Sequence, residues 1–326
     1  MARLGNSYRQ SQCLRVAVEL RLPELLTPGP KSSAELATLT SAHEDSLRRL
    51  LRALAAMQVL VEEPSDHFAL TSLGEQLRSD RLGPAVDLFN SPLYWKVWQS
   101  LDHSVRTGGR AFDHVHGMRD WDYYASHPQD GRRFDAAMSA NTGPVTKAVV
   151  AAYDFSRYRH IADIGGGEGT LLCELLRAYP DIQATLFDRA DVVERAQKRL
   201  RDEGLADRVE FVGGSFFDSM PTGADAYVMK SIIHDWSDEE AIRILSCCRT
   251  AVDPGVHLIL IERVLPERAT PDGLEIFMMD LNMLVNTGGR ERTETEYREL
   301  LGAARFRLQT VVTTDVQVAV LEAVAS

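Results

Sequence analysis

Two short segments of this chain of 326 residues have types and spacings that could do chemistry. The first is a glycine-rich run at residues 161–170, IADIGGGEGT, where an apolar segment leads through glycines into a helix. Glycines let the backbone approach a ligand closely, and a helix start offers unpaired N–H groups. The next predicted strand ends at Asp188, where a carboxylate is placed to accept hydrogen bonds from a ribose. Together these features predict a site for an adenosine-containing cofactor.

The spacing of the glycines narrows the choice of cofactor. The run has the form Gly-x-Gly-x-Gly and departs from the Gly-x-Gly-x-x-Gly of dinucleotide-binding folds. This departure disfavours an NAD-dependent dehydrogenase without excluding it. Each piece also has a purely structural interpretation, since glycines at strand–helix junctions form turns and an Asp after a strand often caps a helix.

The second segment is residues 229–240, MKSIIHDWSDEE, which follow another predicted strand. Ser237 and Glu240 have the spacing of a capping box, so a helix begins there. His234 therefore lies on the loop beyond the carboxyl end of a central strand, where ligands bind in open α/β sheets. An imidazole, whose ordinary pKa is about 6.5, is a suitable base for a hydroxyl at neutral pH. The alternative is a structural histidine beside a helix cap.

The elements that must position these residues follow an alternating pattern from residue 160 onward. Strand-length apolar runs alternate with helical stretches, which predicts a parallel sheet covered by helices on both faces. The runs are Ile161–Ile164, Ala184–Phe187, Val209–Val212, Ala226–Met229 and His257–Ile261. Leu308–Val312 and Val316–Leu321 are rich in β-branched residues and predict a terminal antiparallel hairpin at the sheet edge.

The front of the chain has a different organisation. Leu14–Leu26 predicts an amphipathic helix, and a second, short helix is capped at Ser32 or Ser33. Asp45–Met57 carries leucines at helical spacing and predicts a third helix. Val59–Val61 and Phe68–Leu70 flank a turn and predict a hairpin. This order of elements is the layout of a winged helix, and residues 80–155 are expected to be mostly helical and rich in aromatic side chains.

Composition excludes several function classes. A chain with 25 % charged and 44 % apolar residues buries a real core, and its length predicts about two domains. The net charge is −11, with the acidic excess after residue 110, so no basic surface for nucleic acid is expected. No apolar run is long enough for a membrane span, and the start of the chain lacks the features of a secretory signal. Four scattered cysteines without a CxxC pair suggest a reducing cytoplasm.

Both segments resemble one enzyme family. The glycine run resembles the first motif of class I S-adenosylmethionine-dependent methyltransferases, and residues 230–238 closely resemble the His-Asp-Trp-Ser-Asp motif of plant caffeic-acid-type O-methyltransferases. Bacterial enzymes of antibiotic and pigment pathways share this motif. The resemblance covers nearly the whole chain. It implies an α/β fold with a Rossmann-like seven-stranded methyltransferase sheet and an N-terminal, mainly α winged-helix dimerisation domain.

The resemblance also implies domain limits and site residues. The limits are a dimerisation domain over 1–95, a helical linker with substrate-pocket helices over 96–150, and a cofactor-binding catalytic domain over 151–326. His234 would be the catalytic base, oriented by Glu262 and Glu291. The implied cofactor-binding residues are Asp163, Gly165, Gly166, Gly167, Asp188, Ser215, Phe216, Phe217, Lys230 and Trp236. The implied substrate-binding residues are Trp121, Phe134, Met138, Asn141, Met279, Asn282 and Met283.

Two positions depart from the family pattern. Ser215 stands where the family often has an Asp, so the adenine side of the cofactor would be held differently. Asn141 aligns with a histidine that contacts substrate in the plant enzymes.

The resulting prediction is a homodimeric O-methyltransferase of secondary metabolism. It would transfer a methyl group from S-adenosylmethionine to a hydroxyl of a small aromatic compound, leaving S-adenosylhomocysteine, with no metal. Methylation of carbon or nitrogen, or a hydroxylase that keeps the cofactor, are alternatives on the same fold.

Two further alternatives come from other classes of protein. A winged helix could serve a cofactor-sensing transcription regulator, since Arg48, Arg49 and Arg52 lie on its second helix and could reach phosphates. A charged solvent-facing helix is the simpler interpretation. His103, His114 and His116 raise a metal site, although their spacing fits no standard helical pair of ligands.

Overall fold

The computed structural model describes residues 1–326, except for the side chain of Arg3. The chain forms two compact units. The N-terminal unit comprises Met1–Gln99 and Trp121–Asn141, and the sheet unit comprises Ser100–Asp120 and Thr142–Ser326. The two units therefore alternate along the chain between residues 99 and 142, inside the segment that the sequence interpretation treats as one helical linker.

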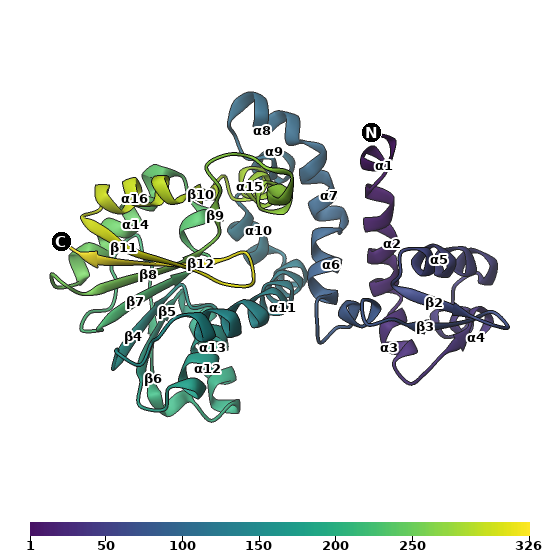
Figure 1. The fold of residues 1–326 in the computed structure, drawn as a ribbon, viewed down its shortest axis with the longest axis horizontal. Helices are drawn as coiled ribbons and strands as arrows, with labels where there is room; N and C mark the ends of the chain where they lie inside the picture. Colours follow the sequence, from purple (N-terminus) through teal and green to yellow (C-terminus); the bar gives the residue numbers. More distant parts are fainter. The chain divides into compact units, whose positions relative to one another are not determined.

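The sheet unit is built on a seven-stranded sheet (Figure 1). In sheet order the strands are β11 (Phe306–Thr313), β12 (Ala319–Ala325), β8 (His257–Glu262), β7 (Ala226–Lys230), β4 (His160–Ile164), β5 (Gln183–Asp188) and β6 (Val209–Gly213). The five strands from β8 to β6 are parallel, whereas β12 runs antiparallel to both β8 and β11. This topology confirms the predicted Rossmann-like methyltransferase sheet.

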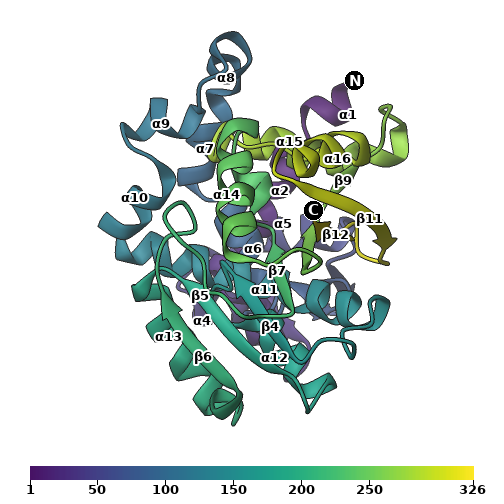
Figure 2. The ribbon, with the colours of Figure 1, turned by 90° about the vertical axis from the view of Figure 1, so that its left-hand side faces the viewer.

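Helices cover both faces of this sheet because its strands are apolar on both sides. Tyr227 and Met229 of β7 pack with α14 (Asp238–Ala251) and α16 (Glu294–Ala303) in one core cluster. Val228, one residue out of phase, packs with α12 (Thr170–Ala178) and α13 (Ala190–Asp202) in the other. Figures 1 and 2 show the helices on either side of the strands.

The N-terminal unit has the predicted winged-helix layout. Its elements are α2 (Tyr8–Glu19), α3 (Leu22–Leu26), β1 (Lys31–Ser32), α4 (Ser33–Thr40), α5 (Glu44–Ala56), β2 (Leu60–Glu63) and β3 (His67–Leu70). Ser32 caps α4 in a capping box with Glu35, as predicted. The single helix predicted over Leu14–Leu26 is wrong, because Arg21 adopts a left-handed conformation at φ 55° and separates α2 from α3.

The aromatic-rich middle of the chain is helical, as predicted. Its helices are α6 (Gly83–Phe89), α7 (Pro92–Gln99), α8 (Leu101–Thr107), α9 (Ala111–His116), α10 (Asp120–Ser126) and α11 (Pro128–Ala152). The remaining elements are α1 (Ala2–Gly5), α15 (Leu274–Asn286), the short strands β9 (Val264–Leu265) and β10 (Arg292–Thr293), and the 3₁₀ helices η1 (Gly74–Leu77), η2 (Ala206–Arg208), η3 (Ile233–Asp235) and η4 (Pro271–Gly273). Within the described residues, none of the helices combines the length and apolar character that crossing a bilayer requires.

The terminal hairpin is present, but its second strand is shifted from the predicted position. β12 begins at Ala319, three residues after Val316, and continues to Ala325. The shift follows from pairing on both sides, since Ala319 lies opposite Glu262 of β8 and opposite Thr313 of β11. A hairpin at the sheet edge was therefore the right expectation, although β12 itself lies inside the sheet.

Candidate active site

Polar side chains gather at the carboxyl ends of the parallel strands. Asp163 lies near the end of β4, and Asp188, Lys230 and Glu262 are the last residues of β5, β7 and β8. Parallel strands end at the same edge of a sheet, which is where ligands bind in open α/β folds. His234 follows β7 on η3, a single 3₁₀ turn where a loop was predicted.

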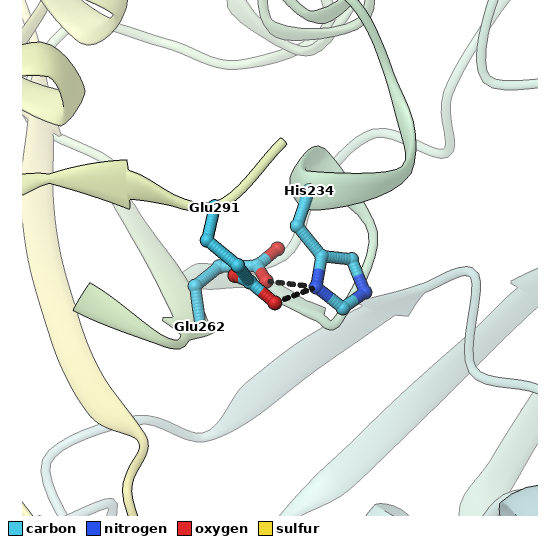
Figure 3. Close-up of side chains that lie close together, drawn as sticks. All are labelled: His234, Glu262 and Glu291. Atoms are coloured by element: carbon cyan, nitrogen blue, oxygen red, sulfur yellow. Dashed lines mark hydrogen bonds and ion pairs between the residues drawn. The ribbon is translucent and has the colours of Figure 1, made fainter. Parts of the chain in front are cut away.

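His234 lies beside two buried glutamates, whose carboxylates both face the same ring nitrogen (Figure 3). Its Nδ1 atom is 3.0 Å from Oε1 of Glu291 and 3.7 Å from Oε2 of Glu262. An ionised carboxylate can only accept, so Nδ1 carries a proton and donates a hydrogen bond to Glu291. The other ring nitrogen, Nε2, points away from both glutamates and lies 3.7 Å from the Asp235 carboxylate, beyond hydrogen-bonding distance. When the imidazole is neutral, its lone pair is therefore on Nε2.

The two glutamates hold different parts of this site. Oε1 of Glu262 accepts hydrogen bonds from the backbone N–H groups of Ile232 and Ile233, at 3.0 and 2.8 Å. Glu262 thus anchors the backbone just before His234, whereas Glu291 makes the hydrogen bond to the ring. Oε2 of each glutamate is buried without a hydrogen-bond partner among the described residues.

Burial and charge act in opposite directions on the imidazole. Burial alone lowers the pKa of His234, but the carboxylates of Glu262, Glu291 and Asp235 outweigh it and raise the pKa to about 10. Burial also raises the pKa of Glu262, and it raises that of Asp235 to about 7. The imidazole of His234 therefore holds its proton more tightly than an imidazole in water does.

The segment after α15 fits closely against the backbone of η3. A Cβ atom on Gly289 would lie 2.0 Å from the carbonyl oxygen of His234, so only glycine allows this approach. The same oxygen accepts a hydrogen bond from the N–H group of Arg290 at 2.8 Å. Oδ1 of Asp280 on α15 accepts from the N–H group of Glu291 at 2.9 Å. These contacts, and the buried Arg292 beside them, were missed from sequence, although the run GGRER around Glu291 was visible.

The glycine run after β4 forms a cradle suited to a cofactor. Gly165, Gly167 and Gly169 all have positive φ, at 70°, 56° and 76°. A Cβ atom on Gly166 would lie 2.9 Å from Oδ2 of Asp163, an oxygen that is buried and has no hydrogen-bond partner among the described residues. Burial raises the pKa of Asp163 to about 7. An unpartnered buried acceptor beside a glycine-rich loop fits the amino end of S-adenosylmethionine.

The acid after the second strand also fits its predicted place. Oδ2 of Asp188 accepts a hydrogen bond from the N–H group of Gly167 at 2.9 Å, and Oδ1 accepts from that of Arg189 at 2.7 Å. Burial raises the pKa of Asp188. The carboxylate is thus fixed against the glycine loop and keeps acceptor capacity for a pair of ribose hydroxyls.

The other predicted cofactor residues lie in the same unit. Burial lowers the pKa of Lys230, while Asp163 and Glu262 oppose that shift. Trp236 packs edge-on against Phe216 and Phe217, with ring centroids 5.8 and 4.8 Å apart. The hydroxyl of Ser215 accepts a hydrogen bond from the N–H group of Phe217. Their contact with a cofactor stays a prediction.

The predicted substrate residues are divided between the two units. Met279, Asn282 and Met283 lie on α15 of the sheet unit, where Asn286 donates to the side chain of Asn282 at 2.9 Å. The other four belong to the N-terminal unit: Trp121, Phe134, Met138 and Asn141. Within that unit the rings of Trp121 and Phe134 meet edge-on at 5.6 Å, and Met138 packs against the same cluster.

Several side chains behind two alternatives, a metal site and a DNA-binding surface, have partners within the protein. The rings of His103 and His114 stack face to face with centroids 4.1 Å apart. In this arrangement their nitrogens do not point toward a common metal ion. In the described part of the chain, only His234, Glu262 and Glu291 bring three ligand atoms within 4.8 Å of one another. Arg48 and Arg52 of the winged helix are paired with carboxylates of Asp66 and Glu62.

Comparison with known families agrees with this geometry. The family described as the O-methyltransferase domain matches residues 98–307, and the O-methyltransferase dimerisation domain matches residues 2–80. The chain belongs to the O-methyltransferase family. It is an S-adenosylmethionine-dependent methyltransferase, as the family resemblance of the two segments implied.

Curated members of this family resemble the chain over most of its length. It is 40 % identical to a mitomycin biosynthesis 6-O-methyltransferase of Streptomyces lavendulae, over 92 % of this chain and 86 % of that protein. It is 38 % identical to the phenazine O-methyltransferase PhzM of Lysobacter antibioticus, over 97 % and 93 %. The solved structure of the mitomycin 7-O-methyltransferase MmcR superposes with a TM-score of 0.91 at 36 % identity, covering 100 % of this chain and 96 % of that one.

Other O-methyltransferase relatives carry names for different reactions. An 8-amino-8-demethylriboflavin N,N-dimethyltransferase of Streptomyces davaonensis is 36 % identical over 90 % of this chain and 85 % of that protein. The aclacinomycin 10-hydroxylase RdmB of Streptomyces purpurascens is 34 % identical over 94 % and 83 %. Relatives of similar identity are thus named for different reactions.

Proposed function

We propose that this enzyme methylates a phenolic hydroxyl of a small aromatic metabolite and that His234 is its base. The observation that carries the proposal is the asymmetric environment of the imidazole. Nδ1 is fixed by Glu291 at 3.0 Å, while Nε2 makes no hydrogen bond to a carboxylate. In its neutral form, the imidazole in this tautomer presents a lone pair at the carboxyl edge of the sheet. A neutral hydroxyl needs such a base, whereas an amine can react without one.

The raised proton affinity of His234 favours a phenol over an aliphatic alcohol as the acceptor. The carboxylates raise the pKa of His234 to about 10. The phenol group of tyrosine has an ordinary pKa of about 10, so an imidazole of raised pKa takes a proton from a phenol more readily than an ordinary imidazole does. The relatives named for mitomycin and phenazine fit the same proposal of an aromatic antibiotic-type acceptor.

The residues of the chain would divide the reaction as follows. S-adenosylmethionine, when bound, supplies a methyl group activated by a positively charged sulfur. Asp163, the glycine loop and Asp188 would hold it, with Ser215–Phe217, Lys230 and Trp236 nearby. Nε2 of His234 takes the proton of the acceptor hydroxyl, and Glu291 and Glu262 stabilise the imidazolium that forms. Trp121, Phe134, Met138, Asn141 and the α15 residues Met279, Asn282 and Met283 are the proposed acceptor contacts.

The assembly and compartment form part of the same proposal. The match of residues 2–80 to a dimerisation domain supports a homodimer formed through the N-terminal domain. These residues lie inside the dimerisation domain predicted over 1–95. All four cysteines are free thiols, including the neighbours Cys247 and Cys248. Free thiols support the cytoplasm as the compartment.

A panel of acceptors with a His234→Ala variant tests the function. We expect a mass increase of one methyl group on at least one phenol, and a fall in kcat of about 10²–10⁴-fold in the variant. His257→Ala is the matched control, because His257 also pairs with a glutamate, Glu322 at 2.8 Å, but at the amino end of β8. Methylation of anilines alone, hydroxylated products, or full activity of His234→Ala would contradict the proposal.

A further inference from the structure

One buried positive charge beside the site has no part in the mechanism above. Arg292 follows Glu291 in the chain, begins β10, and is 1 % exposed. Burying a guanidinium is costly unless its donors are satisfied. Its ion-pair partner is Asp238, at 2.8 Å, whose side chain is half exposed. Most of what surrounds the charge is therefore something other than a carboxylate.

Backbone carbonyl groups on either side of His234 accept hydrogen bonds from the Arg292 guanidinium. Nη1 of Arg292 donates to the carbonyl oxygen of Ile233 at 3.1 Å, and Nη2 donates to that of Trp236 at 2.9 Å. These two residues bracket His234 and Asp235. A planar guanidinium has its donors in a fixed fork, so one side chain sets the separation of both carbonyls.

The residues before and after Glu291 in the chain both contact the backbone around His234. Arg290 binds the carbonyl oxygen of His234 through its N–H group, and Gly289 lies against the same oxygen. Arg292, which follows Glu291 in the chain, donates to the carbonyl oxygen of Ile233. Residues 289–292 are therefore fixed to residues 233–236 at three points, and the Glu291 side chain projects from between them to Nδ1 of His234.

We propose that Arg292 is a positioning residue for methyl transfer, which holds residues 233–236 where His234 meets Glu291 and presents Nε2 to the acceptor. The proposal rests on the proposed role of His234 as the base. Arg292 does not touch the reacting atoms. A lysine keeps the charge but cannot replace it, because a single ammonium group on a flexible chain does not fix two carbonyls in one plane.

An Arg292→Lys variant, assayed beside Arg208→Lys, tests this role. Arg208 is the matched control because its guanidinium also binds backbone carbonyls, those of Leu176, Tyr179 and Pro180, but at the end of α12. For Arg292→Lys we expect kcat to fall roughly 10–100-fold, as for an error of about 1 Å in position, with both KM values within about threefold. Arg208→Lys is expected to keep kcat within about twofold even where its Tm falls.

A readout that does not depend on turnover separates positioning from general damage. Nuclear magnetic resonance of ¹⁵N-histidine reports the tautomer and titration of His234, which faces Glu262, Glu291 and Asp235, with Arg263 behind Glu291 at 3.7 Å. In Arg292→Lys we expect the pKa of His234 to move down toward its ordinary value as the carboxylate contact loosens. The control should leave it unchanged.

The outcomes decide the matter in either direction. Wild-type kcat in Arg292→Lys, or a loss of kcat with an unchanged titration of His234, would overturn the proposal. Asp238→Asn removes the carboxylate and leaves the carbonyl contacts, so we expect less than about a threefold change, as for an exposed ion pair. A loss as large as that of Arg292→Lys would show that the ion pair matters instead. If the wild-type enzyme methylates no phenol, the proposed function fails, while the ¹⁵N titration still tests Arg292.

Discussion

Replacing the two glutamates beside His234 by glutamine should have unequal effects. Glu291 makes the hydrogen bond to Nδ1 at 3.0 Å, whereas Glu262 lies 3.7 Å from that atom and binds two backbone N–H groups. A hydrogen bond to a charged group contributes about 1.5–3 kcal/mol, which corresponds to roughly 10–150-fold in rate. Glu291→Gln loses this term, since the imidazolium no longer meets a carboxylate.

The glutamine at 291 also introduces a second fault. Its amide N–H can donate to Nδ1, which moves the ring proton to Nε2 and removes the lone pair needed for catalysis. An exchange of this kind in the serine protease triad costs about 10⁴-fold in kcat. We therefore expect kcat to fall by about 10²–10⁴-fold in Glu291→Gln, with KM values within about threefold.

Glu262→Gln should be milder. The oxygen of a glutamine at 262 can still accept from Ile232 and Ile233, so the anchor of the loop survives and only the charge is lost. We expect a loss on the order of tenfold. Initial rates of S-adenosylhomocysteine release, measured with the phenol found in the acceptor panel, give both values. Equal losses in the two variants, or a Glu291→Gln enzyme within threefold of wild type, would refute the assigned division between the glutamates.

Two further predictions concern proton affinity and the cofactor. Because the pKa of His234 is raised to about 10, the free enzyme holds a proton there at neutral pH, and kcat/KM should rise about tenfold per pH unit from pH 7 to about 9. The same raised pKa stabilises the fold below pH ~6.5, and this stabilisation is lost as pH rises through about 10. The Tm difference between wild type and His234→Ala should therefore shrink over that range. A midpoint near pH 6.5, in the rate or in the Tm difference, would contradict the corresponding prediction. Gly166→Ala places a Cβ 2.9 Å from Asp163, so calorimetry should show S-adenosylhomocysteine binding at least about tenfold more weakly, with Tm within a few degrees; unchanged affinity would remove the glycine loop from the cofactor site.

The parts of the fold that sequence predicts best depend on local patterns. The strands β4 to β8 were placed to within a residue or two because apolar runs, glycines and helix caps mark their limits directly. The capping box of Ser237 and Glu240 put a helix start after His234, and it is present. Local pattern also gave the glycine loop and Asp188, whose contact with Gly167 the structure adds.

The parts that sequence misses depend on contacts between distant residues. Glu291 meets His234 across 57 positions, and the glutamates entered the prediction only through the family resemblance. Arg292 was not singled out, because nothing local indicates that three carbonyl oxygens and one carboxylate oxygen accept hydrogen bonds from its guanidinium. The break at Arg21 depends on a left-handed residue that helical periodicity cannot reveal. The interleaving of the two units through residues 99–142 follows from packing alone.

The position of β12 has a consequence for synthesis on the ribosome. β8 carries Glu262 at its end, and its second edge is covered only by β12, where Ala319 pairs with Glu262. These paired residues are made nearly 60 positions apart, so at about 5–20 residues per second the open edge of β8 waits roughly 3–12 s for its neighbour. An unpaired apolar strand invites pairing with other chains. The nascent enzyme thus passes through a window in which its sheet is open to aggregation and Glu262 has no strand beside it.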